Sequence, residues 1–314
     1  MKILVDGGAG FVGANFIHYI FNKYPDYEVV NFDKLTYAAN LDNLKDFESN
    51  PNYTFVKGDI CDKSLVERFV EQSDVICHMA AESHVDRSIL APGAFLQTNV
   101  IGTQVLLDAC VKYGKRFHHV STDEVFGFLP FDSKEKFNEQ SSYDPSSPYS
   151  ASKAASDLLV RAYCRTYGLK ATISNCSNNY GKYQHQEKFI PTIIASALKN
   201  QIVPVYGNGL NVRDWVHVLD HCEAIDLIIH KGKIGESYCI GGNEEWRNID
   251  LVKKILKIID KPESLIKFVD DRKGHDLRYA IDSTKVETKL HWKCQFDFET
   301  GLLETVGWYK KNLF

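Results

Sequence analysis

The cysteines of this sequence are scattered and form no motif, so it lacks the marks of a secreted or zinc-binding protein. Eight cysteines occur in 314 residues, and none of them belongs to a C-x-x-C pair. Most have apolar or helical surroundings, which predicts free, buried thiols in a reducing compartment. No disulfide and no metal site is expected. The cysteines are Cys61, Cys77, Cys110, Cys164, Cys176, Cys222, Cys239 and Cys294.

The sequence also lacks a long hydrophobic run and a strong excess of one charge. No apolar stretch reaches the roughly 18 residues that span a bilayer, so no membrane partner is expected. The 37 Lys and Arg against 41 Asp and Glu give a net charge of −4, which provides no reason to expect nucleic-acid binding. The chain begins directly with a strand and a glycine turn, without room for a signal peptide. We therefore expect a cytoplasmic protein.

The first half of the chain alternates short β-branched segments with longer helical patterns. This order implies right-handed βαβ units and hence a parallel sheet covered on both faces. We predict an α/β fold with a Rossmann-type doubly wound sheet, and a surface loop at 128–145. Expected strands are Lys2–Val5, Tyr27–Phe32, Tyr53–Val56, Val75–His78, Phe117–Ser121 and Ala171–Ser174, and expected helices are Phe11–Tyr24, Lys63–Gln72, Thr98–Tyr113 and Pro148–Tyr167.

The rhythm loosens after residue 175, which predicts a second and smaller α/β domain. Helices are expected at Phe189–Lys199 and Leu251–Ile259, with a turn at Gly207–Gly209. A strand at Val212–Val218 and a helix at Asp220–His230 are expected to return to the first domain. The division predicted is a nucleotide-binding domain of residues 1–175 plus about 212–240, and a substrate domain of about 176–211 and 241–314.

A glycine-rich turn follows the first strand and opens the first helix. Its spacing, G-x-x-G-x-x-G, predicts a dinucleotide site in which small residues let the backbone approach a pyrophosphate at the helix N-terminus. The turn comprises Gly7, Gly10, Phe11, Val12 and Gly13. Asp33 ends the second strand, where its carboxylate would accept the ribose hydroxyls and repel a 2′-phosphate. NAD is therefore the expected cofactor.

Asp6 immediately precedes these glycines, where related sequences usually carry Thr. A carboxylate that faced the pyrophosphate would repel it. The side chain could instead point away or cap a neighbouring loop, and the sequence leaves both arrangements open.

Tyr149 and Lys153 are four residues apart at the start of an expected helix, behind Pro148. They share one helix face, so the ammonium can lower the pKa of the phenol and make it a base for a sugar hydroxyl. Taken alone, the pair is also typical of a solvated helix face. Its place in a nucleotide-binding half favours the catalytic interpretation, in which Lys153 also holds the nicotinamide ribose.

Thr122, Asp123 and Glu124 follow the strand that ends at residue 121. Adjacent acids can be a solvated turn or a helix cap, but the carboxyl end of a parallel strand is where such sheets bind ligands. Thr122 could donate to the carbonyl oxygen that develops when the hydroxyl at C4 of a sugar is oxidised. Glu124 could then abstract the acidified C5 proton while Asp123 protonates the departing C6 hydroxyl, because neighbouring carboxylates separate their pKa values.

These features resemble the extended short-chain dehydrogenase/reductase family, and within it the nucleotide-sugar 4,6-dehydratases. The resemblance covers nearly the whole chain, and the Thr-Asp-Glu triplet separates it from the related 4-epimerases. It implies conversion of dTDP-glucose to dTDP-4-keto-6-deoxyglucose by an NAD-dependent lyase, and a homodimer joined through the helices at 98–113 and 148–167. The matching segments are GGAGFVG at 7–13, FDKLTY at 32–37, AAESHVDRS at 80–88, TNV at 98–100, STDEV at 121–125, NCSNNYG at 175–181, EKFIP at 187–191, NVRDW at 211–215 and DRKGHD at 271–276.

The resemblance also implies two sets of binding residues. For NAD, beyond the glycine turn, Tyr149 and Lys153, they are Asp33, Lys34, Leu35, Thr36, Asp59, Ile60, Ala80, Ala81, Ser83, Thr98 and Asn175. For the nucleotide-sugar they are Ser83, His84, Thr122, Asn178, Glu187, Lys188, Phe189, Pro204, Tyr206, Arg213, Asn248, Asp271, Arg272 and His275. Arginines can bind a diphosphate with two parallel hydrogen bonds, although each could equally form a surface ion pair.

Three alternatives to dTDP-glucose dehydration remain: a UDP-glucose 4,6-dehydratase, a nucleotide-sugar 4-epimerase, and a non-catalytic NAD-binding regulator. The epimerase would not need Asp123 or Glu124. The sequence departs from the family pattern at Phe126, Lys182 and Lys273, which replace a usual Tyr and two usual prolines. The sequence does not determine whether the base of the substrate is thymine or uracil. It also does not determine the downstream deoxysugar pathway, which could lead to rhamnose or to another sugar.

Overall fold

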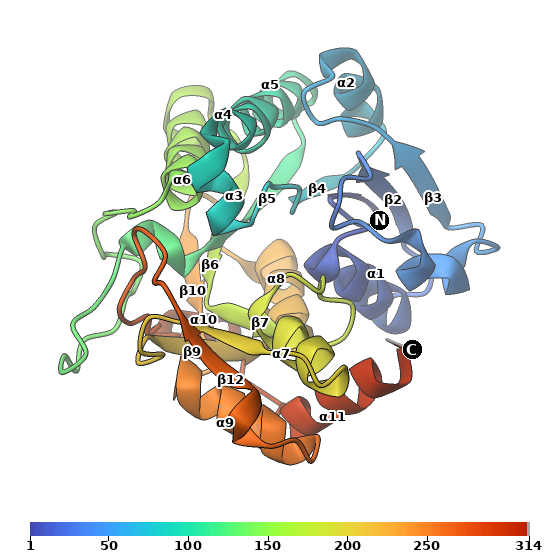
Figure 1. The fold of residues 1–314 in the computed structure, drawn as a ribbon. Helices are drawn as coiled ribbons and strands as arrows, with labels where there is room; N and C mark the ends of the chain where they lie inside the picture. Colours follow the sequence, from blue (N-terminus) through green and yellow to red (C-terminus); the bar gives the residue numbers. More distant parts are fainter. Residues whose placement is uncertain (313–314) are drawn as a thin grey trace.

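A seven-stranded parallel sheet forms the centre of the protein (Figure 1). The structure is a computed structural model and describes residues 1–312. The strand order is β10-β6-β5-β4-β1-β2-β3, so the chain winds outward from β1, crosses back, and winds outward again from β4. The strands are β1 (Lys2–Asp6), β2 (Glu28–Asp33), β3 (Tyr53–Lys57), β4 (Val75–His78), β5 (Arg116–Thr122), β6 (Ala171–Cys176) and β10 (Ser237–Ile240).

Helices cover both faces of this sheet and bury two hydrophobic layers. One layer, with Ile17 and Ile225, lies under α1 (Phe11–Lys23) and α8 (Val218–Lys231). The opposite layer, with Leu107 and Val160, lies under α2 (Lys63–Glu71), α5 (Thr103–Tyr113) and α6 (Pro148–Tyr167). The inner strands are buried on both faces, as expected for a doubly wound sheet, whereas the edge strand β3 is only partly buried. The Rossmann-type α/β prediction is therefore confirmed.

The C-terminal half adds two small sheets and a separate core around Tyr180 and Trp215. The three-stranded sheet has the order β11-β9-β7 and the two-stranded sheet pairs β12 with β8. The strands of the two small sheets are β7 (Asn178–Tyr180), β8 (Val203–Tyr206), β9 (Val212–His217), β11 (Glu245–Arg247) and β12 (Ile266–Val269). The helices of the C-terminal half, apart from α8, are α7 (Phe189–Leu198), α9 (Asn248–Ile258), α10 (Thr284–Leu290) and α11 (Phe298–Asn312).

Helix α6 has strong local signals at both ends, which is why its predicted limits agree with the structure. The Ser147 hydroxyl accepts from the Ser150 amide, and the Ser150 hydroxyl accepts from the Ser147 amide. Pro148 occupies the first turn, and Gly168 ends the helix with a φ of 68°. This reciprocal capping fixes the start of α6 and hence the place of Tyr149.

Two predictions about the strands and helices are wrong. The strand at 212–217 does not join the large sheet, because β9 pairs with β7 and β11, and the unpredicted β10 pairs with β6 instead. The helix expected at 98–113 is preceded by α3 (Val85–Leu90) and α4 (Pro92–Phe95), and its first part, Leu96–Gly102, is a π-helix. The division into two domains as a whole stays a prediction.

The segment Pro92–Tyr113 is long and apolar enough to cross a membrane by length and composition, with a mean hydropathy of 1.2. The expectation that no segment reaches that threshold is therefore wrong. This segment packs against α2 and α6, and the core helix of a soluble protein meets the same criterion. It is thus weak evidence for a membrane span.

Candidate active site

A cavity of about 340 Å³ opens at the carboxyl ends of β1, β4, β5 and β6. This is where the strand order reverses and where open α/β sheets bind ligands. Of the residues predicted to bind NAD, all but two line it: Gly7, Gly10, Phe11, Val12, Gly13, Asp33, Lys34, Thr36, Asp59, Ile60, Ala80, Ala81, Ser83, Thr98, Tyr149 and Lys153. The exceptions are Leu35 and Asn175.

The glycine turn leaves no room for side chains. A Cβ on Gly7, which has a φ of 68°, would lie 2.7 Å from the Ala80 backbone, and one on Gly13 would lie 2.3 Å from the Gly7 carbonyl oxygen. The turn therefore exposes bare backbone to the cavity at the start of α1. Such a cradle fits the pyrophosphate of a dinucleotide.

Asp33 lies beside the cradle and is held by the backbone. Its Oδ2 accepts from the Ala9 amide at 3.0 Å and its Oδ1 from the Leu35 amide at 2.8 Å. Burial raises the pKa of Asp33, and the two amides act in the opposite direction. Each oxygen keeps a further lone pair, so the residues present fit the ribose of NAD. Leu35 contributes through its amide rather than by lining the cavity.

Asp6 points away from the glycine turn and binds the loop that follows β4. Its Oδ1 accepts from the amides of Met79 at 2.9 Å and Ala80 at 2.8 Å, and lies 2.7 Å from His78 Nδ1. The sequence left two arrangements open for Asp6, and the structure has the one in which its side chain caps a neighbouring loop.

Thr122, Asp123 and Glu124 lie in the cavity wall, at the end of β5 and in the 3-10 turn η3 (Asp123–Phe126). The Glu124 amide donates to Thr122 Oγ1 at 3.3 Å, and that hydroxyl donates to Asp123 Oδ1 at 3.2 Å. Asp123 Oδ2 is buried and has no partner within the described residues. Phe126 packs on Phe137 and Tyr143 in a hydrophobic cluster, so its ring lies among side chains of the core.

The two acids have different environments. Burial raises the pKa of Asp123 well above its usual value, and the charges of Glu124 and Asp214 raise it further. Burial also raises the pKa of Glu124, but the guanidinium groups of Arg272 and Arg213 oppose that change. This difference favours a protonated Asp123 beside an ionised Glu124.

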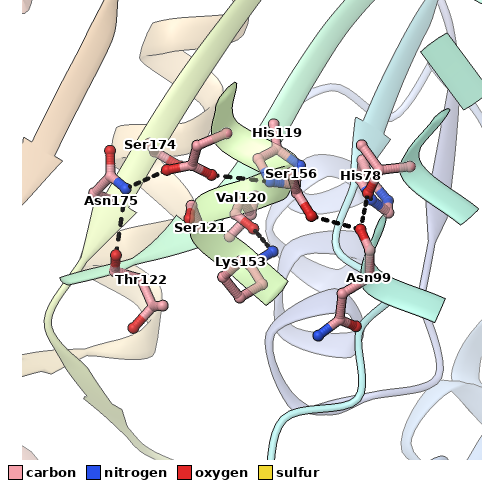
Figure 2. A network of polar contacts seen from close by, with 12 residues as sticks. His78, Asn99, His119, Val120, Ser121, Thr122, Lys153, Ser156, Ser174 and Asn175 are labelled. Atoms are coloured by element: carbon pink, nitrogen blue, oxygen red, sulfur yellow. Dashed lines mark hydrogen bonds and ion pairs between the residues drawn. The ribbon is translucent and has the colours of Figure 1, made fainter. Parts of the chain in front are cut away.

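Tyr149 and Lys153 reach the same cavity from the first turns of α6. Burial raises the pKa of Tyr149 well above its usual value, and the Glu124 carboxylate adds to this. Burial lowers the pKa of Lys153, whereas the negative charge of Asp157 raises it. The Lys153 ammonium donates to the Val120 carbonyl at 2.9 Å (Figure 2). In this structure the phenol is therefore a weak acid, and a base at Tyr149 needs further positive charge.

A buried hydrogen-bond network supports Lys153 and the end of β5. Asp157 Oδ2 accepts from Tyr143 at 2.7 Å and from Asn175 Nδ2 at 2.9 Å, and its Oδ1 lies 3.2 Å from His119 Nε2. The Asn175 amide also donates to the Thr122 carbonyl at 3.3 Å (Figure 2). Asn175, predicted to contact NAD, is thus fully buried in this network rather than in the cavity wall.

The predicted substrate residues divide into two groups. Ser83, Thr122, Asn178, Lys188 and Phe189 line the cavity. The Lys188 ammonium donates to the Ser83 carbonyl at 2.7 Å, and burial lowers the pKa of Lys188 while the charge of Glu124 raises it. The other group lies outside the cavity lining: His84, Glu187, Pro204, Tyr206, Arg213, Asn248, Asp271, Arg272 and His275.

Several members of the second group lie together beyond the cavity. His275 Nδ1 lies 2.6 Å from Asp271, and the rings of His275 and Tyr206 are 6.2 Å apart. Arg213 donates to the carbonyls of Val212 and Asp276, at 2.8 and 3.0 Å, so its guanidinium is already engaged. Glu187 pairs with Arg87 at 3.0 Å.

A family model described as GDP-mannose 4,6 dehydratase matches residues 4–305. The chain belongs to this family of nucleotide-sugar dehydratases. It is 49% identical to the dTDP-glucose 4,6-dehydratase of Escherichia coli over 99% of this chain and 94% of that protein. The solved DesIV, a dTDP-glucose 4,6-dehydratase from Streptomyces venezuelae with NAD bound, has a TM-score of 0.96 and 47% identity over 99% of this chain and 98% of DesIV. A UDP-glucose 4-epimerase from Thermotoga maritima has a TM-score of 0.91 and 29% identity over the full length of both chains.

Several further residues line the cavity of this dehydratase-family chain and were not predicted from the sequence, and His221 is the most buried of them. It lies on α8, and its Nδ1 is 2.9 Å from the side-chain oxygen of Asn179, which also lines the cavity. Burial lowers the pKa of His221 to about 3, so the ring is neutral. A single histidine on an apolar helix gives no signal that separates a cavity residue from a core residue. The other residues missed are Phe32, Ala38, Ala39, Gly58, Met79, Glu82, Val120, Ser121, Cys176, Ser177, Gln184, His185 and Trp215.

Proposed function

We propose that this protein is an NAD-dependent dTDP-glucose 4,6-dehydratase, which converts dTDP-glucose to dTDP-4-keto-6-deoxyglucose. The observation that carries the proposal is that Asp123, Glu124 and Tyr149 share one cavity wall beside the glycine cradle. When bound, NAD supplies an acceptor for a hydride from C4 and returns a hydride to C6, so the cofactor is regenerated in each turnover. The protein supplies the acid and the bases.

Oxidation at C4 requires that a base remove the hydroxyl proton. Tyr149 takes this role, because its phenol lies in the cavity beside Thr122, and contact with Thr122 lowers its pKa against the effect of burial. Lys153, one helical turn away, supplies positive charge and a donor for the nicotinamide ribose. In the substrate complex the Thr122 hydroxyl turns its single proton from Asp123 to the oxygen that becomes the C4 carbonyl.

Elimination of water requires an acid and a base on neighbouring carbons. Once C4 is a ketone, the C5 proton is acidic, and the ionised Glu124 removes it. Asp123, whose pKa is raised well above its usual value, gives its proton to the leaving C6 hydroxyl. The buried, unpartnered Oδ2 of Asp123 leaves one oxygen free to contact the substrate.

The nucleotide part of the substrate lies toward the C-terminal half in this proposal. Arg272 is half-buried, and its Nε is buried without a hydrogen-bond partner in residues 1–312. Arg213 has two of its hydrogen bonds directed to backbone carbonyls. Arg272 is therefore the better candidate for the diphosphate, and Arg213 contributes mainly its charge. Tyr206, His275 and Asn248 complete the nucleotide-binding surface.

The 4-epimerase is the second candidate, because epimerases have the same fold and also use a glycine turn and a Tyr/Lys pair. An epimerase has no use for an acid and a base at residues 123 and 124. The separation of their environments therefore favours the dehydratase. A UDP-glucose dehydratase would use the same groups, and the base preference is left to experiment.

A homodimer and a cytoplasmic location are further parts of the proposal. Leu96 and Ile101 at the start of the helix that continues as α5, and Leu158 on α6, expose large apolar side chains. Burying them against a second copy would form a helical interface, and size-exclusion chromatography with light scattering tests this. The packing of Pro92–Tyr113 against α2 and α6 supports a soluble enzyme.

The deciding experiment incubates the purified protein with dTDP-glucose, and separately with UDP-glucose, without added NAD. We expect a 4-keto product that absorbs in alkali and carries a solvent-derived hydrogen at C5. The ratio of the two rates gives the base preference. A galactose epimer without a keto product would show that the protein is an epimerase instead.

A further inference from the structure

His78 and Asp6 form a buried pair directly behind the cavity wall. His78 ends β4 and Asp6 ends β1, and both side chains are at most 1% exposed. Asp6 Oδ1 lies 2.7 Å from His78 Nδ1 and also accepts the amides of Met79 and Ala80. On the other side of the ring, His78 Nε2 lies 2.9 Å from the hydroxyl of Thr103 (Figure 2 shows His78 beside Asn99).

The hydrogen bonds determine the protonation of His78. The Thr103 hydroxyl donates its single proton to the Asn99 carbonyl at 2.5 Å, and a carbonyl can only accept. Because the contact with Asn99 is the shorter of the two, 2.5 Å against 2.9 Å, the geometry places the hydroxyl proton on that side, and Thr103 accepts from a protonated Nε2 of His78. On the opposite side, a carboxylate oxygen that accepts two amides requires a proton on Nδ1 as well. Both ring nitrogens are donors, so the ring is an imidazolium.

This charge lies beside other buried ionisable groups. The neighbouring ring of His119, whose centroid is 5.0 Å from that of His78, is neutral because burial lowers its pKa to about 3. The buried charges that act on His119 and Lys153 include the carboxylates of Asp6 and Asp157. A protonated His78 places a positive charge directly beside the Asp6 carboxylate. An unpaired Asp6 would instead leave a net negative charge close to the pyrophosphate cradle.

The pair also connects two segments of the cradle. Gly7 and Ala80 both line the cavity and meet backbone to backbone, since a Cβ on Gly7 would lie 2.7 Å from Ala80. Asp6, one residue before Gly7, holds the amides of Met79 and Ala80. We propose that Asp6 and His78 form a permanent carboxylate–imidazolium pair that positions the loop after β4 against the glycine turn for NAD binding. The part concerning NAD rests on the proposed function, and the charge state of His78 does not.

The charge state is tested by nitrogen NMR of the holoenzyme with ¹⁵N-labelled histidine, with the His78 signals assigned from a His78→Gln variant. We expect both His78 nitrogens to be protonated at neutral pH, and Asp6→Asn to convert the ring to a neutral tautomer. A neutral His78 in the unmodified protein would overturn the proposal. This measurement does not depend on catalysis or on the identity of the sugar.

The positioning role is tested by the rate at which bound NAD exchanges with excess labelled NAD. Asp6→Ala removes the acceptor of three hydrogen bonds, and we expect exchange to become about ten-fold faster, equivalent to about 1.4 kcal/mol. Asp6→Asn keeps an oxygen for the two amides but removes the charge, so a smaller increase of about three-fold is expected.

The matched control is Asp226→Ala, which breaks another Asp–His pair, with a buried Asp and a partly exposed His, away from the cavity. Asp226 lies 2.9 Å from His230 and is also 1% exposed. This control is expected to lower thermal stability without changing NAD exchange. Equal exchange rates in Asp6→Ala and the unmodified protein would refute the positioning role. If Asp6→Ala does not fold, Asp6→Asn is used instead, and faster or unchanged NAD exchange has the same meaning. An unmodified protein that holds no NAD at all would contradict the proposed function rather than the positioning role.

Discussion

Replacement of Glu124 by Gln separates elimination of water from oxidation at C4. Gln has nearly the same size, and the hydrogen bond from residue 124 to Thr122 is made by the backbone amide, so this contact remains. The change removes only the base. Tyr149 and Lys153 are not altered, and the first step of the reaction should still occur.

The expected loss follows from the role of Glu124. General-base catalysis contributes about 10²–10⁴-fold to the rate of a proton transfer, so formation of the 4-keto-6-deoxy product should slow by about this factor. The hydride taken from C4 has no acceptor at C6 until water has left. Reduced nicotinamide should therefore accumulate to nearly one equivalent per active site.

The assay is a single turnover with enzyme in excess, followed through the absorbance of reduced nicotinamide and through product formed after quenching. Glu67→Gln, at a surface ion pair with Lys112, is the control and should behave as the unmodified enzyme. A Glu124→Gln enzyme that forms product within about three-fold of the normal rate would refute the assignment of the base, since a lost base costs far more.

The pH dependence gives a second check on the same residues. Glu124 must be ionised, and its pKa is raised, so activity should increase with pH through a value above that of an ordinary glutamate. Asp123 must be protonated, and its pKa is raised further, so activity should decrease again at higher pH. The Gln variant should lose the acidic limb, and a limb that persists would contradict the assignment.

Three further changes test other parts of the site. Asp33→Ala should weaken NAD binding by about ten-fold and reduce the preference for NAD over NADP, because a carboxylate that repels a 2′-phosphate is lost. Titrations with both cofactors measure the two affinities. Asp157→Asn removes a negative charge that raises the pKa of Lys153, so the alkaline limit of C4 oxidation should move to lower pH, which a pH profile of the reduction burst detects. Leu158→Glu, at an exposed position of α6, should convert the proposed dimer to monomers in size-exclusion chromatography. An unchanged preference, pH profile or elution volume would contradict the respective role.

The first half of the fold could be predicted because its signals are local. Strands β1 to β6 are short β-branched segments, and α6 has a cap at one end and Gly168 at the other. Strand β9 was misplaced because a buried strand of β-branched residues has the same pattern in either sheet. Its partners β7 and β11 have only three residues each, and pairing between such short strands is set by tertiary packing.

The cavity residues were predicted best where the backbone determines the contact. The glycine turn and the residues after β4 line the cavity as expected. Asn175 does not line the cavity, because side chains of a strand alternate between two faces. Its neighbour Cys176 faces the cavity, while Asn175 points to Asp157. The substrate group was harder, since Arg213 lies on strand β9 of a small sheet and Arg272 and His275 lie on a loop, and no local pattern specifies the relative positions of these segments.

The adjacent acids show why residue identity alone does not assign catalytic roles. Asp123 and Glu124 follow one another in the chain, but their side chains meet different charges, because the turn η3 directs them differently. Asp214 lies near Asp123 and favours its protonated form, whereas Arg272 and Arg213 favour the ionised form of Glu124. If these arginine charges assign the base, then Arg272→Gln should do more than weaken substrate binding. It should also move the acidic limb of the pH profile to higher pH, an effect that a residue serving only to bind the diphosphate would not have.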